Sequence, residues 1–490
     1  MDRSLREGTC FFLVGICGAG MSSLATLLQD MGMKVRGSDA VRDGPVADRL
    51  LLRGIPVMSE EAAAGELSRD EIVVYSSAIR RDNVVMMAAL SRGADVLHRA
   101  ELLAEIAADY FLMAVAGTHG KTTTSGMIGY VLAKQGFSPT MYVGGHILGG
   151  DIEFPVQRNQ RRSIDGRPIM VMETDESDGS FLRFHPDVAV LTNIDRDHLG
   201  AYGDSMDNLV NAFGQFARQC SEREGLVIGF GDEEASARIT RQAPRHIVYG
   251  EKTSDDVQLI YDSMSNSARV LAPNVNVAFH MTHGDEKSYL NAVAAALACE
   301  RAGVPVIEGL HELETFPGME RRMQVLATYH GATVLTDHAD HPTEIRATMQ
   351  AVSVRYPGRP VTLILQPHRY SRVRTCLEDY GAAVRGASRV ILLDIFPAGE
   401  TIEHPEEWNA RLRECLQNNV GRALSPRLAP EKLLENLRTS ISNDDVFLFM
   451  GPGDVNRLAS RFCALLKSDN AVESELVSPH GETRGQENQE

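Results

Sequence analysis

The sequence predicts an α/β protein of three domains in series, each built on a largely parallel sheet. Apolar runs of strand length alternate with amphipathic stretches of helical length almost throughout, which is the pattern of βαβ units. At 490 residues the chain is long enough for about three domains of ordinary size. Glycine-rich turns also follow two of the apolar runs and open helix-compatible stretches, as in nucleotide-binding α/β domains.

The composition indicates a globular cytoplasmic protein. Hydrophobic residues make up 43% and charged residues 23% of the chain, and the net charge of −17 argues against a general nucleic-acid binder. The seven cysteines form no CxxC pair, which favours reduced thiols over disulfides or a zinc site. No membrane insertion is expected, because no apolar run approaches the roughly 18 residues that span a bilayer.

Residues 1–107 are expected to form the first domain. Its first strand, Phe11–Val14, leads into Gly15-Ile16-Cys17-Gly18-Ala19-Gly20, and Gly37-Ser38-Asp39 lies about 20 residues further on, as in a dinucleotide fingerprint. Cys17 replaces the middle glycine, and a second strand ends at Ser76 and Ser77. We expect a Rossmann-like domain that binds a diphosphate-bearing ligand rather than NAD. The alternative is a βα turn that only packs tightly against its sheet.

Residues 108–318 are expected to form the second domain, which begins with the strand Phe111–Ala116. Gly117-Thr118-His119-Gly120-Lys121-Thr122 follows directly and opens a helix-compatible stretch. Glycines let backbone N–H groups turn towards a phosphate, and a helix N-terminus adds partial positive charge. Lys121 would reach the β/γ-phosphates of ATP and Thr122 would bind Mg²⁺. An ordinary glycine-rich turn is the alternative, but the surrounding strand and helix favour a P-loop ATPase domain.

Acidic residues follow two later strands of this domain. Ile169–Met172 leads into Glu173-Thr174-Asp175-Glu176-Ser177-Asp178, and Val188–Leu191 leads into a segment that ends at Asp197-His198. Ligands of open α/β sheets bind at the carboxyl ends of the strands, so these side chains are candidate Mg²⁺ ligands. Each cluster alone is more typical of a solvated loop. Because a phosphate loop lies in the same domain, we instead favour Mg²⁺ ligands.

Residues 319–466 are expected to form the third domain, after the turn-rich boundary Phe316-Pro317-Gly318. The strands Val361–Leu365 and Val390–Leu393 predict a second Rossmann-like sheet. Residues 467–490 contain few large apolar groups and many Ser, Glu, Asn and Gln, which predicts a disordered tail.

These motifs, taken in order, resemble those of the Mur ligases. The resemblance rests on Gly15–Ser22, Ser76–Ile79, Gly117–Thr124, Asp175–Asp178, Gln366–Arg372 and Pro397–Glu400. It implies a UDP-sugar-binding domain, a central ATPase domain and a C-terminal domain that binds the amino acid. The implied reaction is attack of a carboxylate on the γ-phosphate, followed by attack of an amine on the acyl phosphate. The implied substrates are UDP-N-acetylmuramate and L-alanine, with ATP and Mg²⁺, in a monomer or homodimer.

The resemblance also implies roles for individual residues. The catalytic residues would be Lys121, Glu173, His198 and Arg322. The ligands of Mg²⁺ would be Thr122, Glu173 and His198. ATP would contact Gly117, Thr118, His119, Gly120, Lys121, Thr122, Thr123, Asn291 and Asp337. The UDP-sugar would contact Gly15, Gly18, Ala19, Gly20, Met21, Ser38, Asp39 and Ser76. The amino acid would contact His368, Arg369, Arg372 and Asp340, where Arg369 and Arg372, three apart, would share the face of a helical turn and clamp a carboxylate. Without the resemblance, that pair is more typical of a solvated basic turn.

The sequence departs from the family pattern at several positions. Cys17 replaces a glycine, and Lys287 and Ser288 stand where the family shows His-Asn. His338 and Asp340 stand where it shows Tyr and His, beside the amino-acid pocket. An anionic Asp340 would favour the substrate's ammonium, change the preferred amino acid, or repel its carboxylate; surface drift is the other explanation.

Parts of the sequence are also compatible with three other functions. A ligase that attaches a tripeptide to the same nucleotide sugar is disfavoured by Ser177, where such enzymes more usually have Tyr. A non-catalytic UDP-sugar-binding protein is suggested by the substitutions at 287, 288, 338 and 340. A P-loop NTPase unrelated to cell walls would leave the first and third domains unexplained.

Overall fold

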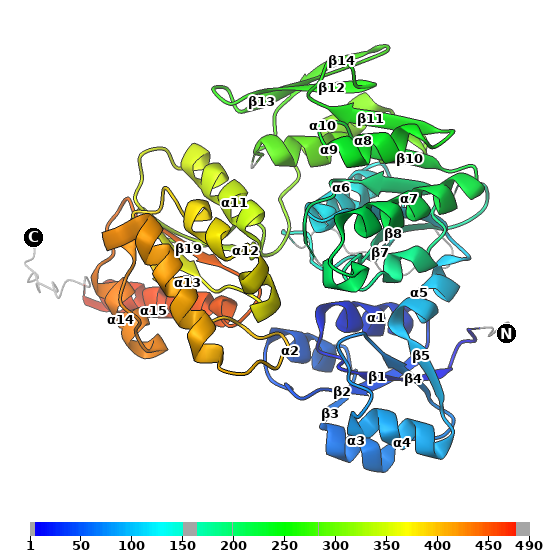
Figure 1. Cartoon of the computed structure of the whole chain (residues 1–490), viewed down its shortest axis with the longest axis horizontal. Coiled ribbons are helices and arrows are strands. Elements are labelled where there is room, and N and C mark those ends of the chain that lie inside the picture. Colours follow the sequence, from blue (N-terminus) through cyan, green and yellow to red (C-terminus); the bar gives the residue numbers. More distant parts are fainter. Residues whose placement is uncertain (1–4, 150–163, 198, 283, 477–490) are drawn as a thin grey trace, which may run out of the picture. The chain divides into compact units, whose positions relative to one another are not determined.

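The computed structural model describes residues 5–149, 164–197, 199–282 and 284–476 (Figure 1). The chain forms two compact units, Met1–Glu320 and Arg321–Glu490. The first unit contains two sheets and the second unit contains one. Among the described residues, none of the helices combines the length and the apolar character needed to cross a bilayer.

The first sheet has five parallel strands in the order β3-β2-β1-β4-β5. Its strands are β1 (Cys10–Val14), β2 (Lys34–Ser38), β3 (Val57–Met58), β4 (Ile72–Tyr75) and β5 (Asp95–His98), and its helices are α1 (Ala19–Asp30), α2 (Pro45–Leu52), α3 (Glu60–Glu66), α4 (Val84–Arg92) and α5 (Arg99–Ala107). Phe11–Val14 are fully buried, as expected of a strand covered on both faces. The strand order reverses between β1 and β4, which is where open α/β sheets bind ligands.

The second sheet has nine strands in the order β14-β13-β12-β11-β10-β9-β6-β8-β7. In the part of the sheet that runs β12-β11-β10-β9-β6-β8-β7, all neighbouring strands are parallel. Strand β13 is antiparallel to both of its neighbours, β12 and β14. The strands are β6 (Phe111–Ala116), β7 (Thr140–Tyr142), β8 (Ile169–Glu173), β9 (Val188–Leu191), β10 (Leu226–Phe230), β11 (His246–Gly250), β12 (Val257–Asp262), β13 (Ser267–Ala272) and β14 (Val275–Phe279). The helices are α6 (Lys121–Lys134), η1 (Ser180–Arg183), η2 (Leu199–Tyr202), α7 (Met206–Glu222), α8 (Glu234–Arg241), α9 (Glu286–Glu300) and α10 (Val306–Leu313).

The two sheets of the first unit share a hydrophobic core. One cluster of buried side chains joins Leu24 of α1 and Leu103 of α5 to Phe181 of η1 and Phe213 of α7. Burying apolar side chains of this size contributes about 1.5–3 kcal/mol each. The carboxyl ends of β1 and β6 are thereby held within one packed unit.

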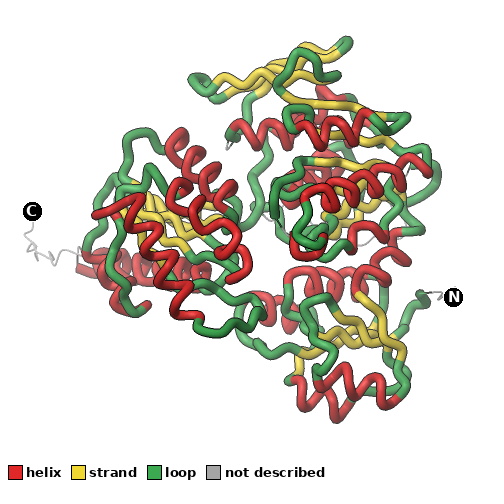
Figure 2. Tube along the Cα trace, viewed as in Figure 1, coloured by secondary structure: helices red, strands yellow, loops and turns green. Residues whose placement is uncertain are grey.

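The second unit is built on the sheet β15-β16-β19-β17-β18, in which only the edge strand β15 is antiparallel. Its strands are β15 (Gln324–Tyr329), β16 (Ala332–Asp337), β17 (Val361–Leu365), β18 (Arg389–Leu392) and β19 (Val446–Met450). Helices α11 (Pro342–Arg355), α12 (Tyr370–Ala383) and α13 (Pro405–Val420) pack on one face, and α14 (Pro430–Thr439) and α15 (Val455–Leu476) on the other (Figure 2).

The predicted fold class is confirmed: three sheets, mostly parallel, follow one another along the chain. The predicted strands Phe111–Ala116 and Val361–Leu365 are found with the same bounds as β6 and β17. The antiparallel extension β12–β14 was not predicted, because its half-exposed strands lack the continuous apolar runs of the central strands. Helix α15 continues to Leu476, past the predicted start of the tail at 467, because this polar segment contains no proline or glycine to end a helix.

Candidate active site

The phosphate loop joins the buried strand β6 to helix α6. Gly117 (φ 137°) and Gly120 (φ 83°) adopt backbone conformations that favour glycine. A Cβ at Gly117 would lie 2.1 Å from Oγ1 of Thr192, so the turn also needs glycine for space. No side chain caps the start of α6. The backbone N–H groups of its first residues, Lys121, Thr122 and Thr123, can therefore bind an anion.

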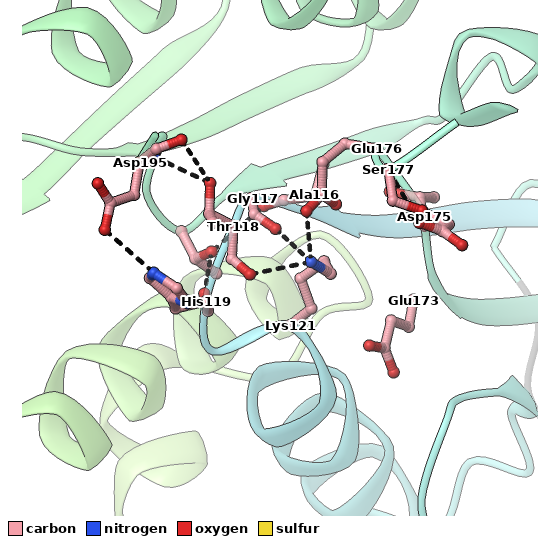
Figure 3. A network of polar contacts seen from close by, with 12 residues as sticks. Ala116, Gly117, Thr118, His119, Lys121, Glu173, Asp175, Glu176, Ser177 and Asp195 are labelled. Carbon is pink, nitrogen blue, oxygen red and sulfur yellow. Dashed lines mark hydrogen bonds and ion pairs between the residues drawn. The ribbon is translucent and has the colours of Figure 1, made fainter. Parts of the chain in front are cut away.

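The end of β9 holds the loop in shape (Figure 3). The side-chain Oδ1 of Asn193 accepts a hydrogen bond from the backbone N–H of His119 at 2.9 Å. The side-chain Nδ2 of Asn193 donates to the backbone carbonyl of His119, also at 2.9 Å. Thr192 donates to the same carbonyl at 2.6 Å, and the carbonyl of Asn193 accepts from Thr118 at 3.0 Å. The ring Nε2 of His119 lies 3.2 Å from Oδ2 of Asp195. Sequence reasoning treated this strand end as a source of metal ligands and missed its role as a support for the loop.

The ammonium of Lys121 turns back onto its own loop (Figure 3). It donates to the carbonyls of Gly117 and Thr118 at 2.6 and 3.1 Å and to Oε1 of Glu176 at 2.9 Å. Burial alone would lower the pKa of Lys121, but the charges of Glu176 and Glu173 outweigh it and raise the pKa. The lysine therefore stays cationic and is held where a bound phosphate would take over from Glu176.

Glu176 is the buried partner of this lysine. Its side chain is 2% exposed, and burial raises its pKa to about 7 despite the opposing charge of Lys121. Its second carboxyl oxygen is buried and has no hydrogen-bond partner among the described residues. Glu176 is thus a buried carboxyl group whose ionised form is favoured by the charge of Lys121.

Thr122 and Glu173 meet at the start of α6. Thr122 donates to Oε1 of Glu173 at 2.9 Å, and Oε2 accepts from the N–H of Gly144 at 2.9 Å. A carboxylate beside a hydroxyl is an all-oxygen donor set, which fits Mg²⁺. The third predicted ligand, His198, lies outside the described residues.

Asn291 of α9 packs onto the phosphate loop. A Cβ at Gly120 would lie 2.8 Å from Oδ1 of Asn291, so the predicted nucleotide-side asparagine is adjacent to the loop. The departure at Ser288 has a local structural role, because its N–H and hydroxyl both donate to Asp285, the N-cap of α9. The side chain of Lys287 lies on the exposed face of the helix.

The glycine-rich turn of the first domain lies at the switch point of its sheet. Gly15 has φ 74° and, with Ile16, donates to the carbonyl of Ser38 at 2.8 and 3.0 Å. Asp39 accepts from the N–H of Cys17 at 2.8 Å, and burial followed by the charge of Asp39 raises the pKa of the Cys17 thiol to about 11. The predicted residues Ser38 and Asp39 therefore brace the turn from β2.

The remaining residues predicted to contact the UDP-sugar differ in burial and in hydrogen bonding. The N–H of Gly18 donates to Gly15 at 3.1 Å, while Ala19 begins α1. Met21 is 2% exposed and belongs to the core, so only its backbone can face a ligand. The carbonyl of Ser76 accepts from Ile79 at 2.9 Å.

A pocket of about 230 Å³ lies within the first unit, between the first glycine-rich turn and the phosphate loop. It is lined by residues of both sheets, among them Gly20, Arg99, Tyr142, Lys121, Glu173 and Asp175. The predicted residues Lys121 and Glu173 therefore line the same pocket, together with Arg99 and Tyr142, which were not predicted. The sequence offered no signal for these two, because neither belongs to a motif and their approach depends on packing between the sheets.

The second unit holds the remaining predicted residues. Asp337 ends β16, and its carboxylate accepts from the N–H groups of Met323 and Ala339 at 2.8 and 2.9 Å. Burial raises the pKa of Asp337 against the opposing charge of Arg322, which precedes β15. The pKa of His338 is lowered to about 3 by burial and then by Arg322 and Arg321, so this imidazole is neutral.

Asp340 is the centre of a charge cluster in this unit. Nη1 of Arg372 forms an ion pair with Oδ2 of Asp340, and Nδ1 of His368 lies 3.0 Å from the same oxygen. Burial alone would raise the pKa of Asp340, but the charge of Arg372 and the contact with His368 lower it. Asp340 is therefore an anion that neutralises Arg372, one of the two predicted carboxylate-binding arginines.

The prediction that Arg369 and Arg372 share a helical face is wrong. Helix α12 begins at Tyr370, and Arg369 precedes it as the N-cap with φ 66°. A residue in this left-handed conformation does not continue the helical spacing. The two guanidinium groups therefore leave the backbone from different local structures.

Three family models match the chain, one on each sheet. They are described as Mur ligase family, catalytic domain (residues 12–111), Mur ligase middle domain (115–299) and Mur ligase, glutamate ligase domain (321–453). Among curated proteins, UDP-N-acetylmuramate–L-alanine ligase of Desulfatibacillum aliphaticivorans is 33% identical over 94% of this chain and 99% of its own length. The ligase of the same name from Kineococcus radiotolerans is 34% identical over 93% of this chain and 95% of its own.

Solved structures show the same architecture. The UDP-N-acetylmuramate–alanine ligase of Thermotoga maritima aligns with a TM-score of 0.78 at 25% identity, over 94% of this chain and 99% of that one. A murein peptide ligase of Psychrobacter arcticus aligns with a TM-score of 0.71 at 21% identity over the same shares, a likeness of fold.

The Lys121–Glu176 pair predicts a pH dependence of nucleotide binding. When phosphates take Lys121, Glu176 loses its cation, its pKa rises above about 7, and it takes up a proton. A bound state that holds more protons is favoured at low pH, so affinity for MgATP should fall as pH rises from 6 to 8. Calorimetric titration across this range measures it, and Glu176→Gln should flatten the slope. The same slope in both proteins would contradict the assignment.

The Thr122–Glu173 pair predicts where Mg²⁺ binds. Glu173→Gln replaces an anionic oxygen with a neutral one and should weaken Mg²⁺ binding, measured in the presence of ATP, by roughly tenfold or more. Thr122→Val should weaken it as well, whereas the matched variant Thr122→Ser keeps the hydroxyl and should not. Equal Mg²⁺ affinity in Thr122→Val and Thr122→Ser would show that the hydroxyl is not a ligand.

Proposed function

The chain belongs to the Mur ligase family, and from this premise we propose that it joins L-alanine to UDP-N-acetylmuramate. Mur ligases are ATP-dependent enzymes that form amide bonds in peptidoglycan synthesis. The names of the relatives that align over nearly the whole chain support this choice of substrates. The structural observation that supports it best is the pocket that Lys121 and Glu173 line together with Gly20 of the first domain.

The proposed reaction needs two anions to meet in that pocket. The carboxylate would attack the γ-phosphorus of ATP, with ADP leaving, and the amine would then displace phosphate from the acyl phosphate; Mg²⁺ would supply charge neutralisation at the phosphates. Lys121, released from Glu176, would bind the phosphates, while Thr122 and Glu173 would hold the metal. The loop is kept in place by Asn193 and Thr192, so little reorganisation is needed when the nucleotide binds.

The acceptor amine is assigned to the second unit. His368, Arg369, Arg372 and Asp340 are proposed to line the amino-acid site, with Arg372 as the group that binds the substrate carboxylate. In this chain the acceptor site contains an ion pair rather than a free guanidinium, because Asp340 already engages Arg372. An incoming carboxylate must share Arg372 with Asp340, whereas an incoming ammonium meets an anion that is already neutralised.

A phosphate-release assay tests the proposed function. Pure protein with UDP-N-acetylmuramate, ATP and Mg²⁺ should release phosphate when L-alanine is added. It should release less with glycine, L-serine or the tripeptide L-alanyl-γ-D-glutamyl-meso-diaminopimelate as acceptor. Lys121→Ala should lower kcat by roughly 10²–10³, because one group aimed at transition-state charge contributes about 3–4 kcal/mol. No amino-acid-dependent release by the wild type would refute the proposal, and preference for the tripeptide would reassign the acceptor.

Asp340 gives a second test. Asp340→Asn removes the charge that neutralises Arg372, so KM for L-alanine should fall several-fold, because the freed guanidinium can bind the substrate carboxylate. The variant should lose about 3 kcal/mol of stability, since Arg372 is left buried without its counter-ion. Steady-state kinetics and thermal unfolding measure the two effects. A higher KM for L-alanine would instead identify Asp340 as the ammonium-binding group.

A further inference from the structure

Arg99 is the first residue of helix α5, and the local sequence fixes its position. His98 caps the helix: its ring accepts from the N–H of Ala100 at 3.2 Å, and its own N–H donates to Glu101 at 3.0 Å. This reciprocal capping box determines where α5 begins. The side chain of Arg99 therefore leaves the helix at its first turn and lines the pocket.

The guanidinium of Arg99 is buried but not saturated. Its side chain is 15% exposed, and Nη2 lies 3.3 Å from Oδ2 of Asp175. Nε is buried and has no hydrogen-bond partner within the part of the chain that the structure describes. An arginine carries five N–H donors, and a buried donor without an acceptor costs about 1–3 kcal/mol. The geometry leaves donors for a ligand.

Arg99 also touches the first glycine-rich turn. A Cβ at Gly20 would lie 2.0 Å from Nη1 of Arg99, so the guanidinium occupies the space that a side chain would take there. The hydroxyl of Tyr142 donates to the carbonyl of Gly20 at 2.9 Å, and burial raises the pKa of this phenol to about 12. Arg99 thus lies between the turn assigned to the UDP-sugar and the acidic strand end that follows β8.

The charged residues that line the pocket leave Arg99 as the cation available to bind a carboxylate. Among the residues that line the pocket, Lys121 and Arg99 are the two cations, and Glu173 and Asp175 are the anions. Lys121 is assigned to the phosphates, and Glu173 to the metal. A carboxylate that must approach a polyphosphate needs a cation of its own, and the planar fork of arginine matches a carboxylate with two parallel bonds.

We propose that Arg99 binds the carboxylate of the nucleotide-sugar substrate and positions it next to the phosphates held by Lys121. The proposal rests on the proposed function, because it assumes a UDP-sugar that carries a carboxylate. The competing role is purely structural: Arg99 would tie α5 to Asp175 and hold the two sheets together.

The two roles predict different effects of an Arg99 substitution on the affinity for ligands with and without the carboxylate. UDP-N-acetylglucosamine is UDP-N-acetylmuramate without the lactyl ether that carries the carboxylate. Calorimetry with Arg99→Ala should show UDP-N-acetylmuramate binding weakened about 10- to 100-fold, the loss typical of a hydrogen bond to a charged group. UDP-N-acetylglucosamine binding should change less than about twofold, and Arg99→Lys should be intermediate for the carboxylate ligand.

Arg183→Ala is the matched control. Arg183 of η1 pairs with Glu101 of α5 at 3.3 Å, so it also links the two sheets, but it does not line the pocket. This variant should bind both nucleotide sugars like the wild type.

Equal weakening of both ligands by Arg99→Ala, or no weakening of either, would overturn the role of Arg99. Equal affinity of the wild type for both sugars would overturn it too, since the carboxylate would then contribute nothing. Failure of the wild type to bind UDP-N-acetylmuramate at all would instead refute the proposed function.

Discussion

The site of the first unit depends on the reciprocal hydrogen bonds between Asn193 and the backbone of His119. These bonds join the end of β9 to the loop between β6 and α6, two segments more than 70 residues apart in sequence. They set the carbonyls that Lys121 contacts and the direction of the first turn of α6. Because a loop supported in this way needs little rearrangement, its donors can act on a phosphate without a large ordering cost.

In each of the two units, carboxylates pair with the cationic side chains that are proposed to bind substrates. Lys121 is held by Glu176, Arg99 by Asp175 and Arg372 by Asp340. A buried cation without a partner would be strongly destabilising, so each pair lets a positive charge exist in a poorly hydrated place. Substrate anions can then replace or share the carboxylate, which makes binding an exchange of partners rather than the burial of a bare charge.

The departures from the family pattern have different physical consequences. Ser288 serves the capping of α9, and Cys17 offers its backbone N–H to Asp39, so both fit their local structure. Asp340 is different, because it changes the charge of the proposed acceptor site and engages an arginine that was expected to clamp a carboxylate. The identity of the amine is therefore the part of the proposed reaction that depends most on this chain's own residues.

The sequence by itself determined the three α/β domains, the strands Phe111–Ala116 and Val361–Leu365, and the glycine-rich turns, because each of these is encoded in contiguous residues. It also placed Glu173 at a strand end, and the structure sets its carboxylate against Thr122. Only the tertiary structure decided that Arg99 and Tyr142 line the pocket, that Glu176 holds Lys121, and that Asp340 neutralises Arg372. These contacts join residues far apart in the chain, and their geometry follows from how helices pack on sheets, which no local pattern records.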